Sequence, residues 1–417
     1  MAKNNAGQFS DTQNSFAAKT YAGETHRTIS PAETISHVKP LMARMGITRV
    51  ANVTGLDRIG LPVVMVTRPN SRSVAVAQGK GLTLEAATAS GLMEAVETWH
   101  GERIQLPLKY ASYTDILNDC PVVDVKTLPH SRGGRFQPNK RLLWIEGEDI
   151  AGEQQLWVPY EMVHTDYTLP VPSGHGCFSC STNGLASGNH LYEAQCHAMC
   201  ELIERDALSV WHARAQNERA ATRVKLETVD NAYCQRALGL LEQAGFNVFV
   251  WDTMNDIEVS SFYCLIAEKG NTLSHVGAGS GCHLNPGIAL LRAITEAAQT
   301  RMTYISGARD DMWPGEFSEQ GITQKHQMVH TLVGDGEPQQ EFSSAKTSES
   351  KNFSLDRQTL VNTLTKAGLG QVIFINLSRT EIGIPVVRSI IPGLEAPHDE
   401  DDYVAGPRAR NAAGRSS

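Results

Sequence analysis

Residues 183–205 constrain this chain most, because a turn rich in Asn and Gly runs there into a long helical pattern. Four polar side chains of the helix, Glu193, His197, Glu201 and Glu204, are spaced four, four and three residues apart and therefore share one stripe. Apolar side chains flank this stripe on both sides. A row of acids between two apolar surfaces predicts a helix that points carboxylates into a cleft.

Carboxylates that converge in a cleft repel one another. Two unit charges about 4 Å apart cost roughly 4 kcal/mol at an effective dielectric constant near 20. The repulsion is relieved when the pKa values of the acids rise or when a cation lies among them. Oxygen ligands favour a hard cation, Mg²⁺ or Ca²⁺. A lone Glu pair three residues apart also fits an ordinary solvated helix face, so the metal interpretation depends on further acids elsewhere.

Length, composition and charge exclude several classes of protein. The 417 residues are enough for a large core and two or three packed subdomains. The chain is 41% hydrophobic and 20% charged, as in soluble globular proteins. Its net charge of −8 and the lack of a basic patch argue against nucleic-acid binding. The sequence contains no signal-peptide core and no apolar run of membrane-spanning length, so we expect a cytoplasmic protein without a membrane partner.

Eight cysteines are scattered along the chain, and Cys177 with Cys180 forms a C-x-x-C motif. A structural zinc site would need a second pair in a similar arrangement, and the sequence has none. We therefore expect free thiols in a reducing compartment rather than zinc or a redox dithiol.

Hydrophobic periodicity predicts alternating helices and strands in the order of a mixed fold. The helices are expected at 31–46, 83–103, from the central turn to about 213, and at 229–244, 286–305 and 354–367. The strands are expected at 47–53, 61–67, 141–146, 155–159, 247–251, 261–267, 371–376 and 385–391. We predict a disordered tail over 1–24, one domain over 25–394 with an exposed loop at 335–355, and a flexible tail over 395–417 with little to bury.

One pattern recurs three times: a turn containing Gly, followed by a helix with inward polar residues. Gln78-Gly79-Lys80-Gly81 precedes the first helix, the central turn precedes the second, and residues 277–281 precede the third. Such turns at helix N-termini predict backbone N–H groups that bind phosphates. The inward residues of the three helices are Ser90, Glu94 and Glu97; Glu193, Glu201 and Glu204; and Arg292, Glu296 and Gln299.

Three segments together resemble the YcaO family: residues 90–97, residues 183–205, and the pattern Arg292-x-x-x-Glu296-x-x-Gln299-x-Arg301. The resemblance extends over residues 25–407. It implies an α+β fold of the YcaO type, with mixed sheets and with helices that converge on a cleft for ATP and Mg²⁺. It further implies an enzyme that uses ATP to phosphorylate the oxygen of a peptide amide, so that a nucleophile can replace this oxygen.

The resemblance also implies roles for individual residues. It implies Mg²⁺ ligands at Glu94, Glu97, Glu201, Glu204 and Glu296. It implies nucleotide contacts at Arg27, Thr34, Ser90, Asn183, Glu193, Arg205, Arg292 and Gln299. Among these residues we assign catalysis to Glu201, Glu204, Arg205 and Arg292. Arg27 alone also fits an ordinary surface arginine.

Positioning and electrostatics are expected to carry the catalysis, because an amide oxygen is a poor nucleophile and a poor leaving group. No side chain needs to act as a covalent nucleophile. Four histidines are candidates for acid–base roles, although each also fits a hydrogen-bonded structural histidine: His175, His190, His197 and His283.

Residues 46–56 and 68–73 are similar to the bacterial YcaO subgroup that is associated with TfuA-type partner proteins. This similarity implies thioamide formation on a peptide or protein substrate, with a TfuA-like partner that helps to deliver sulfur. Azoline-forming members often carry a proline-rich C-terminal tail, and a self-sufficient one needs a large N-terminal leader-binding extension. The sequence shows neither feature, which argues against a self-sufficient cyclodehydratase. An azoline-forming cyclodehydratase and a non-catalytic accessory factor stay open as alternatives, and the family resemblance implies a homodimer.

Overall fold

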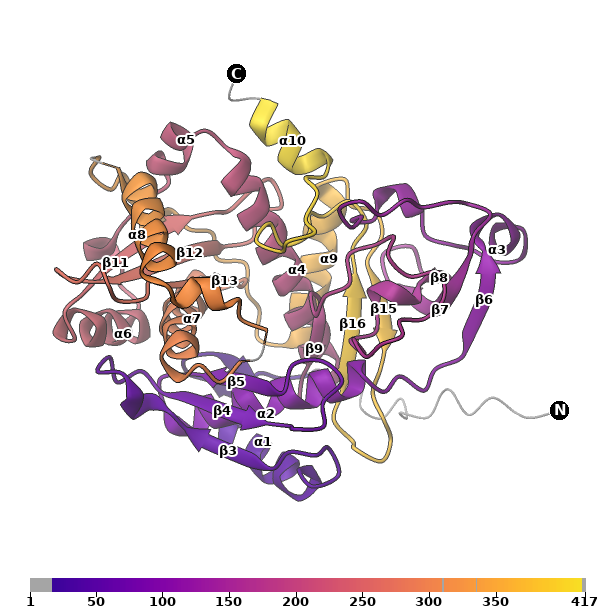
Figure 1. Ribbon diagram of the computed structural model, residues 1–417, viewed down its shortest axis with the longest axis horizontal. Helices are drawn as coiled ribbons and strands as arrows, with labels where there is room; N and C mark the ends of the chain where they lie inside the picture. Colours follow the sequence, from indigo (N-terminus) through magenta and orange to yellow (C-terminus); the bar gives the residue numbers. More distant parts are fainter. Residues whose placement is uncertain (1–16, 310, 335, 415–417) are drawn as a thin grey trace.

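The computed structural model describes residues 17–309, 311–334 and 336–414. They form a mixed α+β fold with three main sheets (Figure 1). One antiparallel sheet has the order β3 (Arg49–Asn52), β4 (Val63–Thr67), β5 (Val76–Lys80), and another has the order β11 (Phe246–Asp252), β12 (Ser261–Glu268), β13 (Gly277–Cys282). The six-stranded sheet has the order β6 (Leu108–Ser112), β7 (Arg141–Asp149), β15 (Ile373–Asn376), β16 (Val386–Ile390), β9 (Leu185–Ser187), with β8 (Gln154–Pro159) paired to β7.

The helices cover these sheets. The long ones are α2 (Leu84–Gly101), α4 (Leu191–Ala213) and α7 (Pro286–Ser306), and they come together near the middle of the molecule (Figure 1). The others are α1 (Pro31–Val38), α3 (Tyr113–Asp119), α5 (Gln216–Ala221), α6 (Ala232–Gln243), α8 (Glu319–Val333), α9 (Phe353–Lys366) and α10 (Pro407–Gly414). Two small pairs complete the fold: β1 (Tyr21–Ala22) with β2 (His26–Arg27), and β10 (Val224–Lys225) with β14 (Gln340–Glu341). No helix in the described ranges combines the length and apolarity needed to cross a bilayer.

Each long helix follows a strand of the sheet on which it packs: β5 and α2, β9 and α4, β13 and α7. The apolar flanks of α4 explain its orientation, since Met199 and Ile203 pack with Phe374 and Val387 of the six-stranded sheet. This packing leaves the polar stripe of α4 facing the other two helices.

The prediction of Gly-rich turns is wrong for the first and third units, because Gln78, Gly79 and Lys80 lie in strand β5 and residues 277–281 lie in strand β13. The glycines serve close packing instead. A Cβ atom at Gly79 would overlap the carbonyl oxygen of Ala87 and the backbone of Gly91 in α2. The central turn is a real one, since Gly184 has φ +80°, a conformation that side chains of L-residues rarely adopt.

The predicted C-terminal tail is also wrong for its described residues, 395–414, because its charges are paired. Glu395 is buried and accepts the backbone N–H groups of Gly406 at 2.7 Å and Ala409 at 2.9 Å. Arg408 contacts Asp206, a fully buried residue of α4, at 2.8 Å. These contacts hold α10 on α4. Residues 415–417 lie outside the described residues.

Other boundaries differ for local reasons. The first helix ends at Val38 instead of 46, because Pro40 in the following 3-10 turn lacks the N–H group that would continue it. Part of the predicted loop 335–355 is packed, with β14 paired to β10 and with Phe342 and Phe353 buried. Residues 1–16 of the predicted N-terminal tail lie outside the described residues, whereas Ala17 is buried and β1 pairs with β2.

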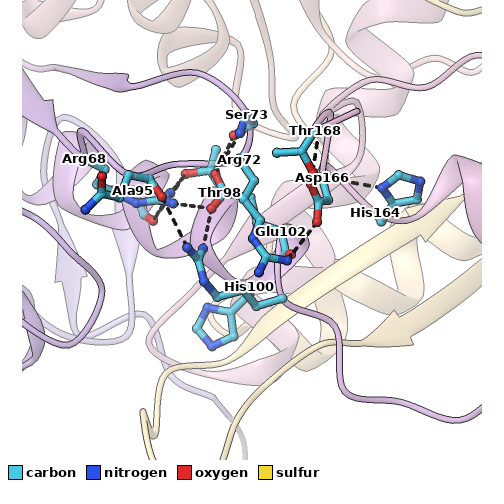
Figure 2. Close-up of polar contacts among 12 residues, drawn as sticks. Arg68, Arg72, Ser73, Ala95, Thr98, His100, Glu102, His164, Asp166 and Thr168 are labelled. Atoms are coloured by element: carbon cyan, nitrogen blue, oxygen red, sulfur yellow. Dashed lines mark hydrogen bonds and ion pairs between the residues drawn. The ribbon is translucent and has the colours of Figure 1, made fainter. Parts of the chain in front are cut away.

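A buried polar network ties the end of α2 to the segment after β4 (Figure 2). Arg68 is 3% exposed, donates to Thr98 Oγ1 at 2.6 Å and pairs with Glu102. The hydroxyl of Ser73 also donates to Glu102, at 2.7 Å. Arg72 pairs with Asp166 at 2.8 Å and so attaches the loop after β8 to the same corner.

We predict that Gly79→Ala destabilises the protein, because its Cβ atom has no room against the backbone of α2. Overpacking of this kind costs about 1–3 kcal/mol. Gly239→Ala in α6 is the matched control, since nothing lies within 4 Å of its Cβ position. Replacing a helical Gly in open space should stabilise by up to about 1 kcal/mol. Thermal unfolding measures both, and a Gly79→Ala variant as stable as wild type would contradict the packing argument.

Candidate active site

Helices α2, α4 and α7 and the N-terminal segment enclose a cavity of 610 Å³. All but one of the residues predicted as Mg²⁺ ligands or nucleotide contacts line it. They are Arg27 and Thr34; Ser90, Glu94 and Glu97 of α2; Glu193, Glu201, Glu204 and Arg205 of α4; and Arg292, Glu296 and Gln299 of α7. The exception is Asn183, which lies next to the cavity-lining Thr182 and has a buried Oδ1 atom without a hydrogen bond to any described residue.

A lysine that the sequence reasoning missed neutralises one of the acids. Lys80 of β5 lies 2.5 Å from Glu296 Oε2 and 3.1 Å from Gln299 Oε1. The Gln299 amide in turn donates to the carbonyl oxygen of Gln78 at 2.6 Å. Alternation along the strand could have identified Lys80 from the sequence. Successive side chains of a strand point to opposite faces, so Gly79 faces α2 while Gln78 and Lys80 face α7.

The other acids have partial hydrogen bonding. Glu97 accepts the N–H group of Ser187 at 2.8 Å and its hydroxyl at 2.7 Å. Glu204 is 2% exposed, and its Oε1 atom accepts the hydroxyl of Ser280 at 2.7 Å. Its Oε2 atom is buried and has no hydrogen-bond partner in the described part of the chain. A buried acceptor without a partner is typical of a site that binds a further group.

Loss of water in the cavity controls the charge of these acids. Burial raises the pKa of Glu94 to about 7 and that of Glu97 to about 8. Burial also raises the pKa of Glu201. Burial acts in the same sense on Glu296, but there Lys80 and positively charged arginines outweigh it and hold the pKa well below its usual range. Glu94, Glu97 and Glu201 therefore ionise more readily when a cation lies beside them, whereas Glu296 is already ionised.

The same cavity contains positive charge and one neutral histidine. Arg205 lies 3.6 Å from Glu204 Oε1, and Arg292 lies 3.4 Å from His197 Nε2. Burial and the charge of Arg292 hold the pKa of His197 well below its usual range, so its imidazole is neutral. His197 is the one acid–base candidate from the sequence that lines the cavity. His190 caps α4 and accepts the N–H group of Tyr192.

The N-terminal segment closes one side of the cavity. Arg27 Nε lies 3.6 Å from Glu193 Oε1, and Thr28 donates to Glu193 Oε2 from its backbone at 3.0 Å and its hydroxyl at 2.7 Å. Thr34 donates to Asn189 Oδ1 at 3.3 Å. Thr28 and Asn189 were missed by the sequence reasoning, and no spacing pattern marks them.

No group of three or more acid, His or Cys side chains among the described residues forms a ready-made metal site. This arrangement fits Mg²⁺ bound together with a nucleotide, since Mg²⁺ in such sites takes one or two carboxylates plus phosphate oxygens and water. The donors are carboxylate oxygens, which suit this hard cation, and the vacant Oε2 atom of Glu204 is one of them.

Comparison with known proteins agrees with this chemistry. Residues 78–395 match the family model described as YcaO cyclodehydratase, ATP- and Mg²⁺-binding. A protein encoded in the tfuA 3′ region of Rhizobium leguminosarum bv. trifolii is 33% identical over 402 residues, which cover 92% of each chain. A Methanothermobacter thermautotrophicus protein is 32% identical over 88% of this chain and 94% of its own.

Solved structures show the same fold. YcaO from Methanopyrus kandleri, bound with AMPPCP and Mg²⁺, has a TM-score of 0.74 at 22% identity and covers 94% of this chain and 98% of its own. A heterocyclase in complex with substrate and cofactor has a TM-score of 0.78 at 23% identity over 91% of this chain. The present chain spans 54% of that heterocyclase. The chain therefore belongs to the YcaO family of ATP-dependent, peptide-modifying enzymes, with ATP and Mg²⁺ as its cofactors.

Proposed function

We propose that this enzyme activates a peptide backbone amide by O-phosphorylation and that a TfuA-like partner delivers the sulfur that replaces the oxygen, which gives a thioamide. The observation that carries the proposal is the set of carboxyl groups enclosed in one cavity with Lys80, Arg205 and Arg292. The relative encoded beside tfuA, aligned over 92% of both chains, supports the partner and the sulfur chemistry.

We assign the residues as follows. The Mg²⁺ ligands are Glu94, Glu97, Glu201, Glu204 and Glu296. The nucleotide contacts are Arg27, Thr34, Ser90, Asn183, Glu193, Arg205, Arg292 and Gln299. Glu201, Glu204, Arg205 and Arg292 act on the reacting groups. A peptide or protein is the substrate, and a homodimer stays a prediction.

The chain contributes charge and position to this reaction. Bound ATP and Mg²⁺ supply the transferred phosphoryl group and the charge that neutralises it. Arg205 and Arg292 bring fixed positive charge into the cavity, which stabilises charge that develops during phosphoryl transfer. Lys80 keeps Glu296 ionised, and the neutral His197 adds no charge beside Arg292.

Azoline formation is the alternative, and it needs a substrate side chain as the nucleophile. Residues 395–414 pack on α4, and none of them lines the cavity. This segment therefore supplies no group there to take a proton from a substrate side chain, which favours a nucleophile from outside. A non-catalytic role is disfavoured, because a scaffold has no need to hold mutually repelling acids in one cavity.

We predict that Glu201→Gln lowers ATP turnover by at least about a hundredfold, since it removes charge from a Mg²⁺ site while keeping size and hydrogen bonding. Glu242→Gln on the exposed face of α6 is the matched control and should leave turnover unchanged. Circular dichroism checks that both variants fold. Wild-type turnover by Glu201→Gln in the presence of a substrate peptide would remove Glu201 from the metal site.

We predict that binding of the Mg²⁺–nucleotide releases protons at neutral pH. Because the raised pKa values of Glu94 and Glu97 keep both partly protonated, a metal must displace protons to bind. Affinity should therefore fall as the pH is lowered from about 9 to about 6. Isothermal titration calorimetry in two buffers of different ionisation enthalpy measures the protons released. Glu97→Gln should reduce this number, and a value of zero in the wild type would contradict the assignment.

We predict that a substrate peptide gains about 16 Da per modified amide when it is incubated with ATP, Mg²⁺, sulfide and the partner, because sulfur replaces oxygen. Replacing the neighbouring Cys, Ser and Thr of the peptide with Ala should not prevent the reaction. Mass spectrometry separates this result from azoline formation, which lowers the mass by about 18 Da and needs those side chains. A loss of mass without any sulfur source would identify a cyclodehydratase.

A further inference from the structure

Arg388 lies directly behind the wall of the active-site cavity, and none of the roles above involves it. In the register of β16 with β9 it stands opposite Leu185, and Leu185 itself lines the cavity. Arg388 is only 3% exposed. Arg388 is therefore a buried cation on the strand next to a strand that lines the active-site cavity.

Two of the three guanidinium nitrogens of Arg388 have no hydrogen-bond partner in the described structure. Neither its Nε nor its Nη1 atom makes a hydrogen bond within residues 17–309, 311–334 and 336–414. A buried cation that has lost its water and lacks hydrogen bonds is costly, because charges at a distance offset the loss of hydration only in part. Arg68, which is equally buried, differs in that Glu102 and Thr98 accept from its two Nη groups, so that only its Nε atom lacks a hydrogen bond in the described structure. A structural explanation therefore holds for Arg68 but not for Arg388.

The loop of residues 163–182 contributes two groups that act on Arg388, Tyr167 and Cys180. Among the side chains that act on the pKa of Arg388, Tyr167 has the largest electrostatic effect and Cys180 the second largest. Burial raises the pKa of Cys180 to about 11, so its thiol stays protonated. Thr165 is fully buried, and its hydroxyl has no hydrogen-bond partner among the described residues. The Arg72–Asp166 ion pair attaches this loop to the end of α2 (Figure 2).

Two carboxyl groups also act on Arg388, but neither pairs with it within 4.0 Å in the described structure. Glu201 faces the cavity and accepts the N–H group of Gly184 at 3.3 Å. Glu400 accepts the hydroxyl of Ser179 at 3.4 Å. Both accept hydrogen bonds from other donors, so the N–H groups on Nε and Nη1 of Arg388 are left for a ligand from outside the described chain.

We propose that Arg388 is the anchor of a binding site for a small monovalent anion, and that in the reaction this anion is hydrosulfide. The near-complete burial of Arg388 keeps bulk water away from it and disfavours a large, strongly hydrated anion such as phosphate. A buried guanidinium with N–H groups left over suits an anion, which accepts charge-assisted hydrogen bonds. The identity of the anion rests on the proposed thioamide function, whereas the anion site itself does not.

An anion held beside Glu201 lies close to the active-site cavity. We therefore assign it to the step that follows phosphorylation of the amide. Hydrosulfide attacks the carbon of the O-phosphorylated amide, so a C–S bond forms and the C–O bond breaks. The oxygen leaves with the phosphoryl group as phosphate, and the S–H proton moves to the amide nitrogen. The product is the thioamide, and no oxidant or reductant is required.

Bromide, which has a similar size and the same charge as hydrosulfide, tests the site without turnover. We expect crystals soaked in sodium bromide to show an anomalous peak within hydrogen-bond distance of Arg388 in wild type and none there in Arg388→Met. Bromide peaks only on the protein surface in the wild-type crystals would overturn the proposal. Arg388→Met should be at least as stable as wild type, because it removes an unsatisfied buried charge.

Kinetics tests the role of the anion. Arg388→Met should raise KM for sulfide at least about tenfold in the thioamide assay and leave KM for ATP unchanged, as expected for the loss of a charge-assisted hydrogen bond. Arg388→Lys should restore part of the sulfide affinity. Arg44→Met is the matched control, since the side chain of Arg44 is 52% exposed.

The failures of the two proposals are distinguishable. A bromide peak at Arg388 in a protein that makes no thioamide would refute the proposed function and keep the anion site. Thioamide formation with an unchanged KM for sulfide in Arg388→Met, and no bromide at Arg388, would refute the inference and keep the function.

Discussion

Carboxyl groups that share one poorly hydrated cavity repel each other, and the site depends on how the fold holds them there. Glu97 gains hydrogen bonds from Ser187, Glu204 gains one from Ser280, and Glu296 gains Lys80. The remaining cost appears as raised pKa values at Glu94 and Glu97. A divalent cation between these groups and nucleotide phosphates relieves that cost, which couples metal binding to the state in which the chemistry occurs.

The acids meet because two of the three helices, α2 and α7, approach their strands too closely for a side chain to fit between them. Gly79 in β5 brings the backbone of α2 near, and Gly279 and Gly281 in β13 do the same for α7. The result is a repeated unit in which a strand ends close to the catalytic face of the following helix. Lys80 at the end of β5 reaches Glu296 on α7, so two units share one ion pair. In β5, the glycine that allows close packing of α2 and the lysine that pairs with Glu296 are adjacent residues.

The helices and their inward faces were predictable from sequence, because apolar periodicity fixes which side of α2, α4 and α7 faces the core. The roles of the glycines were not, since a Gly-rich strand and a Gly-rich turn have the same composition and differ in their long-range partner. The packing of residues 395–414 was missed for a similar reason. Arg408 looks like a tail residue until Asp206, two hundred positions earlier, lies beside it at 2.8 Å. The sequence could not single out Arg388, because the lack of hydrogen-bond partners for its Nε and Nη1 atoms among the described residues is a property of the folded state.

The central claim is that the enclosed acids bind the metal of an ATP complex, and a crystal structure with Mn²⁺ and a non-hydrolysable ATP analogue tests it most directly. Anomalous scattering locates Mn²⁺ independently of the model phases. The account predicts manganese peaks in the cavity at about 2.1 Å from carboxylate oxygens of residues among Glu94, Glu97, Glu201, Glu204 and Glu296, with phosphate oxygens completing the coordination. A nucleotide bound outside this cavity, or manganese held there without any of these carboxylates, would contradict it.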